Sequence, residues 1–163
     1  MRLISIALVS VLLACGATGT TRPATMIRVK ASTPSVSLLG GFEYTTSVRD
    51  RSMTDPGVEV VFRIRNTAAS SAALETTGCV DIQLFRDADP TRPEFSLLAV
   101  VACGNSVVAT PFQSGEIIEF TRPLADAVIA GRVQTGEYQI GTTLPKLRSA
   151  QPPVTMIGRV TLQ

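Results

Sequence analysis

Alternation of apolar and polar residues is the clearest signal along this chain, and it predicts β-strands. The strongest example spans residues 58–66, whose positions on one face are Val58, Val60, Phe62 and Ile64. A repeat of two residues sends successive side chains to opposite faces, so we expect one face of this strand to be buried. Weaker copies of the pattern predict further strands at residues 26–30, 42–46, 107–109, 117–121, 138–144 and 154–162.

One segment departs from this alternation and predicts a short helix. Pro123 stands near its start, alanines fill its interior, and Gly131 follows its end. Proline is favoured in the first turn of a helix and glycine just after the last, so we expect about two turns over residues 123–130. Together, about seven to nine short strands and one helix predict an all-β fold, an antiparallel β-sandwich of the immunoglobulin-like type.

Two cysteines stand at the ends of a predicted hairpin. Its strands are residues 79–86 and 94–103, and the stretch between them is rich in turn-forming residues. The start of the chain, described below, predicts export, and an oxidising compartment favours a disulfide between Cys79 and Cys103. Their spacing is too wide for a CxxC redox or zinc motif. A pair of buried free thiols is the alternative.

The same disulfide would set the register of the hairpin. Direct pairing of the two cysteines places Ile82 opposite Val100 and Leu84 opposite Leu98. The apolar face of the hairpin would then consist of Val80, Ile82, Leu84, Leu98, Val100 and Ala102. The cysteines fall on the opposite face together with Asp81, so we expect the disulfide on the outer side of the sheet.

The start of the chain has the composition of a secretory signal. Arg2 precedes a mostly apolar run from Leu3 to Leu13, and about eleven residues are well short of the roughly 20 that a membrane-spanning helix needs. The sequence Leu12-Leu13-Ala14-Cys15 resembles the bacterial lipobox. The resemblance implies a lipoprotein signal peptide over residues 1–14 and membrane lipid attached to Cys15; a plain signal peptide with an incidental cysteine is the alternative.

Cysteine numbers favour the lipoprotein interpretation. The chain has three cysteines, and acylation of Cys15 leaves one pair rather than an odd thiol. The resemblance implies a lipid-anchored protein of the bacterial cell envelope. Because Gly16 rather than aspartate follows Cys15, it also implies the outer membrane, at its periplasmic face or surface, in an organism with two membranes. Residues 15–25 predict a flexible tether, which leaves 26–163 as the folded domain.

Composition and charge bear on the class of function. The net charge of +2 is too small to attract nucleic acid. Histidine is absent, which removes the most common general base and transition-metal ligand. Glu116 and Glu119 fall on opposite faces of one predicted strand and cannot converge on a substrate. We therefore expect a non-enzymatic protein that needs no cofactor and no metal.

The turn of the cysteine hairpin is a candidate interaction loop. Asp87 and Asp89 suggest a calcium site, but their spacing matches no EF-hand, and a solvated turn is the simpler interpretation. Two prolines stiffen the same turn, which could present Arg92 to a trypsin-like protease. Prolines in an exposed hairpin also prevent edge pairing, so an ordinary surface turn is the alternative.

Three segments carry a resemblance to a known family. They are residues 60–66, ending in Asn66; Ser114-Gly115-Glu116, followed by Phe120; and residues 133–138, which end in Gly136-Glu137-Tyr138. From Val58 onward the chain resembles the BsuPI-type family of immunoglobulin-like domains, named for a bacterial intracellular proteinase inhibitor. The cysteine hairpin replaces the tryptophan-bearing segment common in that family.

The last of these segments also resembles the tyrosine corner of immunoglobulin-like domains. The family resemblance implies the sandwich fold and, as an alternative function, proteinase inhibition. Our leading expectation is a membrane-anchored envelope lipoprotein whose sandwich is an interaction or structural module. Its partners would be membrane lipid, through Cys15, and an unknown envelope protein or protease.

Overall fold

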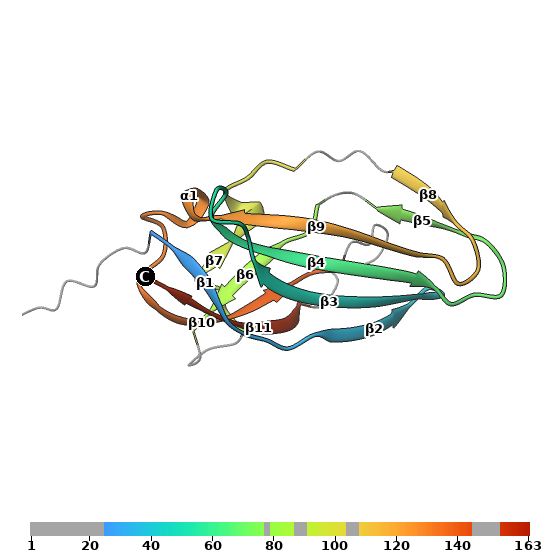
Figure 1. The fold of residues 1–163 in the computed structure, drawn as a ribbon, viewed down its shortest axis with the longest axis horizontal. Helices are drawn as coiled ribbons and strands as arrows, with labels where there is room; N and C mark the ends of the chain where they lie inside the picture. The colour runs from blue at the N-terminus through green and yellow to red at the C-terminus, as the bar shows by residue number, and fades with distance from the viewer. Residues whose placement is uncertain (1–24, 77–78, 87–90, 104–107, 145–153) are drawn as a thin grey trace, which may run out of the picture.

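The protein is an all-β sandwich, seen in a computed structural model that describes residues 25–76, 79–86, 91–103, 108–144 and 154–163 (Figure 1). One sheet has five strands in the order β1 (Ile27–Ser32), β11 (Thr155–Leu162), β10 (Gly136–Thr142), β6 (Ile82–Phe85) and β7 (Phe95–Ser96). The second has four, in the order β2 (Ser35–Leu39), β3 (Phe42–Asp50), β4 (Gly57–Asn66) and β9 (Ile117–Ala125). A separate pair consists of β5 (Ala72–Thr76) and β8 (Val108–Phe112).

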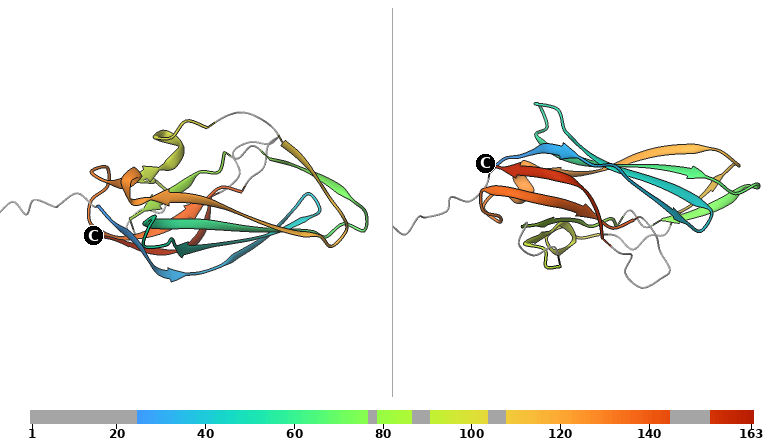
Figure 2. Two further views of the ribbon diagram at one scale, coloured as in Figure 1. Left: turned by 45° about the horizontal axis from the view of Figure 1, so that its top comes forward. Right: turned by 90° about the horizontal axis from the view of Figure 1, so that it is seen from below.

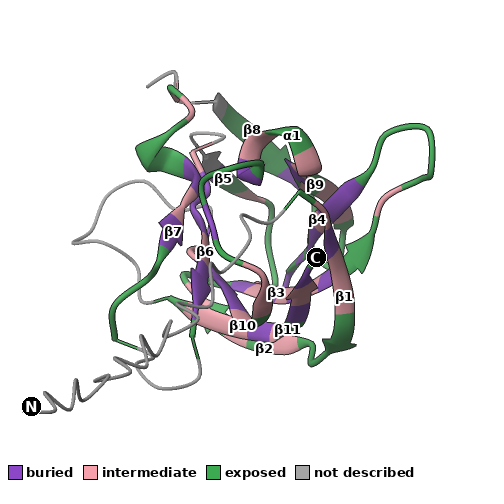
Figure 3. Ribbon diagram, turned by 90° about the vertical axis from the view of Figure 1, so that its left-hand side faces the viewer, coloured by how far each residue is buried: buried purple, intermediate pink, exposed green. Residues whose placement is uncertain are grey.

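Alternating side chains build the core between the two large sheets. In β4, Val58, Val60, Phe62 and Ile64 are all buried, as their spacing predicts, and the first three belong to this core. Phe62 stacks on Phe120 of β9, with ring centroids 5.1 Å apart. Figure 3 shows buried residues along strands of both large sheets. A smaller cluster beneath the β5–β8 pair consists of Phe42, Tyr44, Ile64, Leu74, Phe112 and Leu144.

The strands predicted from alternation are present, several with longer bounds. β3 continues from Phe42 to Asp50, past the predicted end at residue 46, and β9 continues to Ala125. The described residues contain eleven strands rather than seven to nine. The two additional ones are β2 and β5, which have five residues each. Strands of that length contain too few repeats for alternation to stand out.

The predicted helix over residues 123–130 is wrong in extent. Only α1 (Asp126–Ile129), a single turn, is helical. The preceding residues belong to β9, in which Pro123 lies opposite Glu59 and Ala125 opposite Gly57 of β4. Proline is tolerated there because β9 is an edge strand of its sheet and its open side needs no N–H donor.

The predicted register of the cysteine hairpin is also wrong. Leu84 lies opposite Phe95 and Gln83 opposite Ser96, rather than Leu84 opposite Leu98. After Ser96 the chain leaves the sheet and forms η1 (Leu97–Ala99), a 3₁₀ turn.

The apolar face of the cysteine hairpin also differs from the predicted one. Val80, Ile82 and Leu84, in the first predicted strand of the hairpin, are buried as expected. Leu98 and Val100 are 37% and 39% exposed, and Ala102 is exposed as well. Asp81, expected on the outer side of the sheet, is buried instead.

The first two strands form one extended stretch that changes sheet. β1 pairs with β11, and after Thr33 and Pro34 the chain continues as β2, which pairs with β3. Figure 2 shows this passage from one layer to the other. At the other end of β1, Thr25 and Met26 donate backbone hydrogen bonds to the carbonyl of Gln163 at 2.8 and 3.1 Å. The first and last described residues therefore lie together at one end of the sandwich.

Candidate functional site

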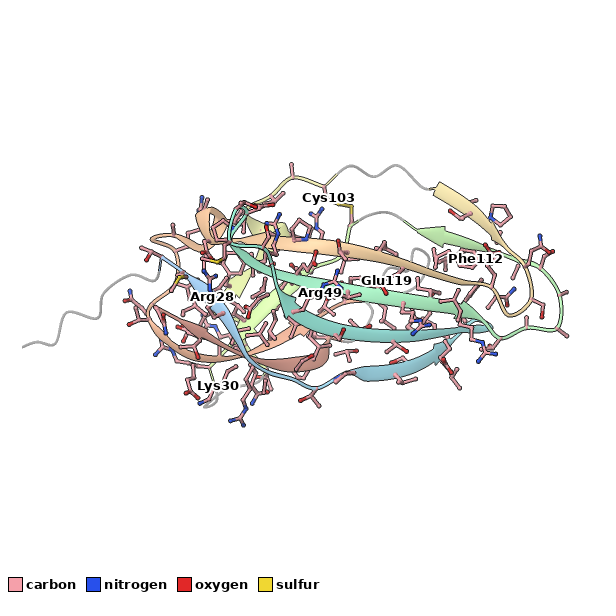
Figure 4. All side chains as sticks on the ribbon, in the orientation of Figure 1. Arg28, Lys30, Arg49, Cys103, Phe112 and Glu119 are labelled. Atoms are coloured by element: carbon pink, nitrogen blue, oxygen red, sulfur yellow. A yellow bond between two sulfur atoms is a disulfide. The ribbon has the colours of Figure 1, made fainter. Side chains whose placement is uncertain are left out.

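The candidate site is the hairpin of residues 79–86 and 91–103, which we call the braced hairpin. Cys79 and Cys103 are joined by a disulfide, with Cα atoms 5.6 Å apart and a sequence separation of 24 residues. Figure 4 shows Cys103 above β9, at the rim of the sandwich. The predicted bond is therefore present, although the hairpin that it closes has a different register.

Asp81 fixes the second strand of the braced hairpin. Its side chain accepts hydrogen bonds from Ser96 Oγ at 2.9 Å and from the backbone N–H of Leu98 at 3.0 Å. Gln83 Nε2 donates a further bond to it at 2.7 Å. A buried carboxylate is costly without such donors. Their positions explain why the chain turns into η1 directly after Ser96.

Arg86, Glu94 and Tyr138 hold the base of the turn, where the two strands of the braced hairpin separate. Arg86 Nε donates to Glu94 Oε1 at 2.5 Å, and Arg86 Nη2 donates to Tyr138 Oη at 2.7 Å. The guanidinium also lies over the tyrosine ring, 5.2 Å from its centroid. The contacts tie both sides of the turn to β10.

The hydroxyl of Tyr138 completes a tyrosine corner. It lies 3.1 Å from the carbonyl oxygen of Gln134, four residues upstream, and 3.1 Å from Glu94 Oε2. A bond back to the upstream backbone is the defining contact of that motif, so the structure has the contact that the Gly136-Glu137-Tyr138 sequence indicates.

The protonation states of Arg86 and Tyr138 suit a structural role in holding the turn rather than proton transfer. Burial raises the pKa of Tyr138, and Glu94 raises it further, while Arg86 opposes the change. The hydrogen bond with Glu94 raises the pKa of Arg86. At neutral pH the tyrosine therefore stays protonated and the arginine charged, so neither has a pKa near the operating pH of a general base.

The predicted interaction residues lie only partly within the described chain. Arg92 is exposed at the turn, whereas Asp87 and Asp89 lie outside the described residues. Cys15 and nearly all of the predicted tether also lie outside them. Within the described ranges, no group of three or more His, Cys, Asp or Glu side chains is placed to hold a metal ion.

The two glutamates weighed as catalytic candidates have other contacts. Glu116 precedes β9, and its side chain accepts a hydrogen bond from the N–H of Gln113 at 2.7 Å. Glu119 lies in β9, 4.0 Å from Arg49 Nη1 (Figure 4). One carboxylate therefore closes a turn and the other belongs to a surface charge pair, so they do not face a common substrate position.

Asn66 is a structural residue whose role sequence reasoning missed. It is fully buried at the end of β4. Its side-chain amide donates to the carbonyls of Ser70 and Phe112 at 3.0 and 3.2 Å, and its Oδ1 accepts from the N–H of Ala68 at 2.9 Å. The one sequence feature that could have indicated this role is the position of Asn66 at the end of the predicted strand 60–66.

An open pocket of about 190 Å³ lies on the outer face of the five-stranded sheet. It is lined by Thr33, Gln139, Met156, Gly158 and Arg159. One arginine among neutral residues defines no particular ligand, and we assign none.

The fold and the braced hairpin define a class of protein, an all-β sandwich stabilised by a disulfide. Comparisons with protein-family models, curated proteins and solved structures found no match to this chain. None of the helices in the described ranges is long and apolar enough to cross a membrane.

Proposed function

We propose that this protein is a lipoprotein of the bacterial cell envelope whose sandwich is a non-enzymatic interaction or structural module. The observation that carries the proposal is the sequence Leu12-Leu13-Ala14-Cys15 directly after an apolar run. Two or three acyl chains on one cysteine make attachment to a membrane durable. With Gly16 after that cysteine, the outer membrane is the proposed address in an organism with two membranes.

The contacts of the braced hairpin support the interaction module. The disulfide, Asp81 and the Arg86–Glu94 pair fix its strands, and Arg92 is exposed beyond them. A binding loop on a rigid base loses less conformational entropy when a partner binds. We therefore assign the braced hairpin as the contact surface for another envelope protein.

The lipid attachment is tested by labelling cells with a fatty-acid analogue. Wild-type protein should carry the label, fractionate with membranes and have the mass of the acylated mature chain. Cys15→Ser should lose the label and the added mass. A double variant, Cys79→Ser with Cys103→Ser, is the matched control and should keep both. Unchanged fractionation and processed mass in Cys15→Ser would contradict the proposal.

The contact surface is tested by crosslinking in the native envelope. A photo-crosslinking amino acid at Arg92 should capture a discrete partner that mass spectrometry can identify. The same amino acid at Arg132, another exposed arginine outside the hairpin, is the control. Equal capture at both positions, or none at Arg92, would remove the hairpin as the contact surface.

Proteinase inhibition is the second candidate, and the exposure of Arg92 on a braced base favours it. An inhibitor loop presents its residue in a fixed conformation, which the Arg86–Glu94–Tyr138 contacts would supply here. Titration of trypsin-like and subtilisin-like proteases provides the test. Loss of protease activity that Arg92→Ala abolishes would support inhibition, and full activity at micromolar protein would eliminate it.

A further inference from the structure

Strand β2 pairs with no described residue along its outer edge and has exposed apolar side chains. It pairs with β3 on one side and is the last strand of its sheet on the other, at the lower rim of the view in Figure 1. Val36 and Leu38 are 62% and 73% exposed, while the alternate residues Ser35, Ser37 and Leu39 are half-buried. The strand contains no charged residue.

The other edge strands of the described sheets carry features that prevent pairing. Open strand edges recruit further strands unless charges, prolines, bulges or short length prevent it. β1 has Arg28, Lys30 and a bulge, β9 has Pro123, β8 has Pro111, β5 has Glu75, and β7 has only two residues. Within the described part of the chain, β2 is the edge strand with none of these features.

The turn between β2 and β3 determines which backbone groups point outward. Leu39 and Phe42 are paired across Gly40 and Gly41, whose φ angles are +61° and +83°. Residues that close such a two-residue hairpin bond to each other through both backbone groups, and the bonding alternates along the strand. Val36 and Leu38 therefore direct their N–H and C=O groups to the open edge.

We propose that β2 pairs antiparallel with β2 of a second copy of this chain, about a two-fold axis at Ser37. That register places Val36 opposite Leu38 of the partner copy. The outward N–H and C=O groups of the two residues can then bond across the axis, and their exposed apolar side chains can pack together. It places Pro34 opposite Gly40, where pairing ends on both sides. No like charges meet, whereas the same operation on β1 would bring Arg28 and Lys30 together. The pairing does not depend on lipid at Cys15.

A cysteine at Ser37 tests the register in the full chain within its native envelope. In the proposed dimer the two Ser37 residues form a non-hydrogen-bonded pair with Cα atoms about 4.5 Å apart, within the range that a disulfide bridges. Ser37→Cys should give a covalent dimer on a non-reducing gel, and Ser52→Cys, on an exposed loop, should not. Covalent bonding of Ser37→Cys only to a different protein would overturn the second copy as the occupant.

A charge at the edge tests the dimer without any crosslink. Sedimentation of the detergent-solubilised full chain should give twice the monomer mass for wild type. Val36→Lys should restore the monomer mass, because it places a charge opposite Leu38 of the partner copy. The control is Ile117→Lys, which changes an exposed apolar residue on the opposite edge of the same sheet and should leave the dimer intact. Monomeric wild type, or a dimer that survives Val36→Lys, would overturn the proposal.

Discussion

The four-stranded sheet and the braced hairpin reach a fixed structure by different means. Along β3 and β4 nine consecutive residue pairs keep one register, and burial follows the alternation of side chains along most of both strands, with Val61 of β4 buried as an exception. In the braced hairpin only two residue pairs form between β6 and β7, and a disulfide and a buried carboxylate supply the remaining order. The sheet is held by repeated apolar packing, whereas the hairpin depends on a few specific groups.

The sheet should suffer most from loss of a central side chain. Phe62→Ala removes a fully buried ring that stacks on Phe120, and we expect a loss of about 3–5 kcal/mol of unfolding free energy. Urea unfolding monitored by circular dichroism measures it. Arg63→Ala, on the exposed face of the same strand, is the control and should change stability by about 0.5 kcal/mol or less.

Removal of the disulfide should have the next largest effect. Replacing Cys79 and Cys103 together by Ala releases the loop that joins two positions 24 residues apart in sequence, and the expected loss is about 3 kcal/mol. Wild type unfolded in the presence of a reductant should show the same loss. Equal stability of the oxidised and reduced proteins would mean that the hairpin is held without its covalent bond.

Asp81→Ala should destabilise the braced hairpin by about 1–3 kcal/mol, because it leaves partly buried donors without their acceptor. Hydrogen exchange should locate the change, with the N–H of Leu98 losing protection. Asp55→Ala, which breaks an exposed ion pair with Arg51, is the control and should cost about 1 kcal/mol or less. Unchanged protection of Leu98 would contradict the role assigned to Asp81.

Tyr138→Phe should have the smallest effect at neutral pH, about 1 kcal/mol for the lost hydroxyl contacts. Its signature lies at alkaline pH. Because the pKa of Tyr138 is raised in the folded protein, stability is fully present below about pH 10 and is lost as the pH rises beyond it, since the unfolded tyrosine ionises first.

The same measurement separates the two tyrosines of the chain. Burial also raises the pKa of Tyr44, so Tyr138→Phe should reduce the alkaline loss of stability without abolishing it. Tyr44→Phe keeps the Arg86 and Glu94 contacts of Tyr138 and is the matched control. Urea unfolding at a series of alkaline pH values gives the slope of unfolding free energy against pH for each variant. An unchanged alkaline slope in Tyr138→Phe would contradict the assigned pKa direction.

The contrast between the two regions also explains what the sequence could predict. The strand at 58–66 was predictable because four apolar residues at every second position all indicate the same buried face. The register of the hairpin was not, because it depends on where the carboxylate of Asp81 meets Ser96 and Leu98. The helix was overestimated because Pro123 suits both a first helical turn and an edge strand, and only pairing with Glu59 decides between them.

The candidate site shows the same division. Counting cysteines indicated the Cys79–Cys103 pair, and the Gly136-Glu137-Tyr138 segment indicated the tyrosine corner. The Arg86–Glu94 pair spans a turn between two strands, and no local pattern shows that charges eight residues apart will meet. Such contacts follow from the register, which the sequence did not predict.

The meeting of Thr25 and Gln163 at one end of the sandwich has a mechanical consequence. The ladder between β1 and β11 begins there, with Ile27 opposite Leu162, and continues to Ser32 opposite Gly158. A force that pulls on the chain ahead of Thr25, along the axis of β1, loads the bonds of this ladder together rather than one after another. The end of the domain that faces the proposed anchor is therefore the end best arranged to bear tension.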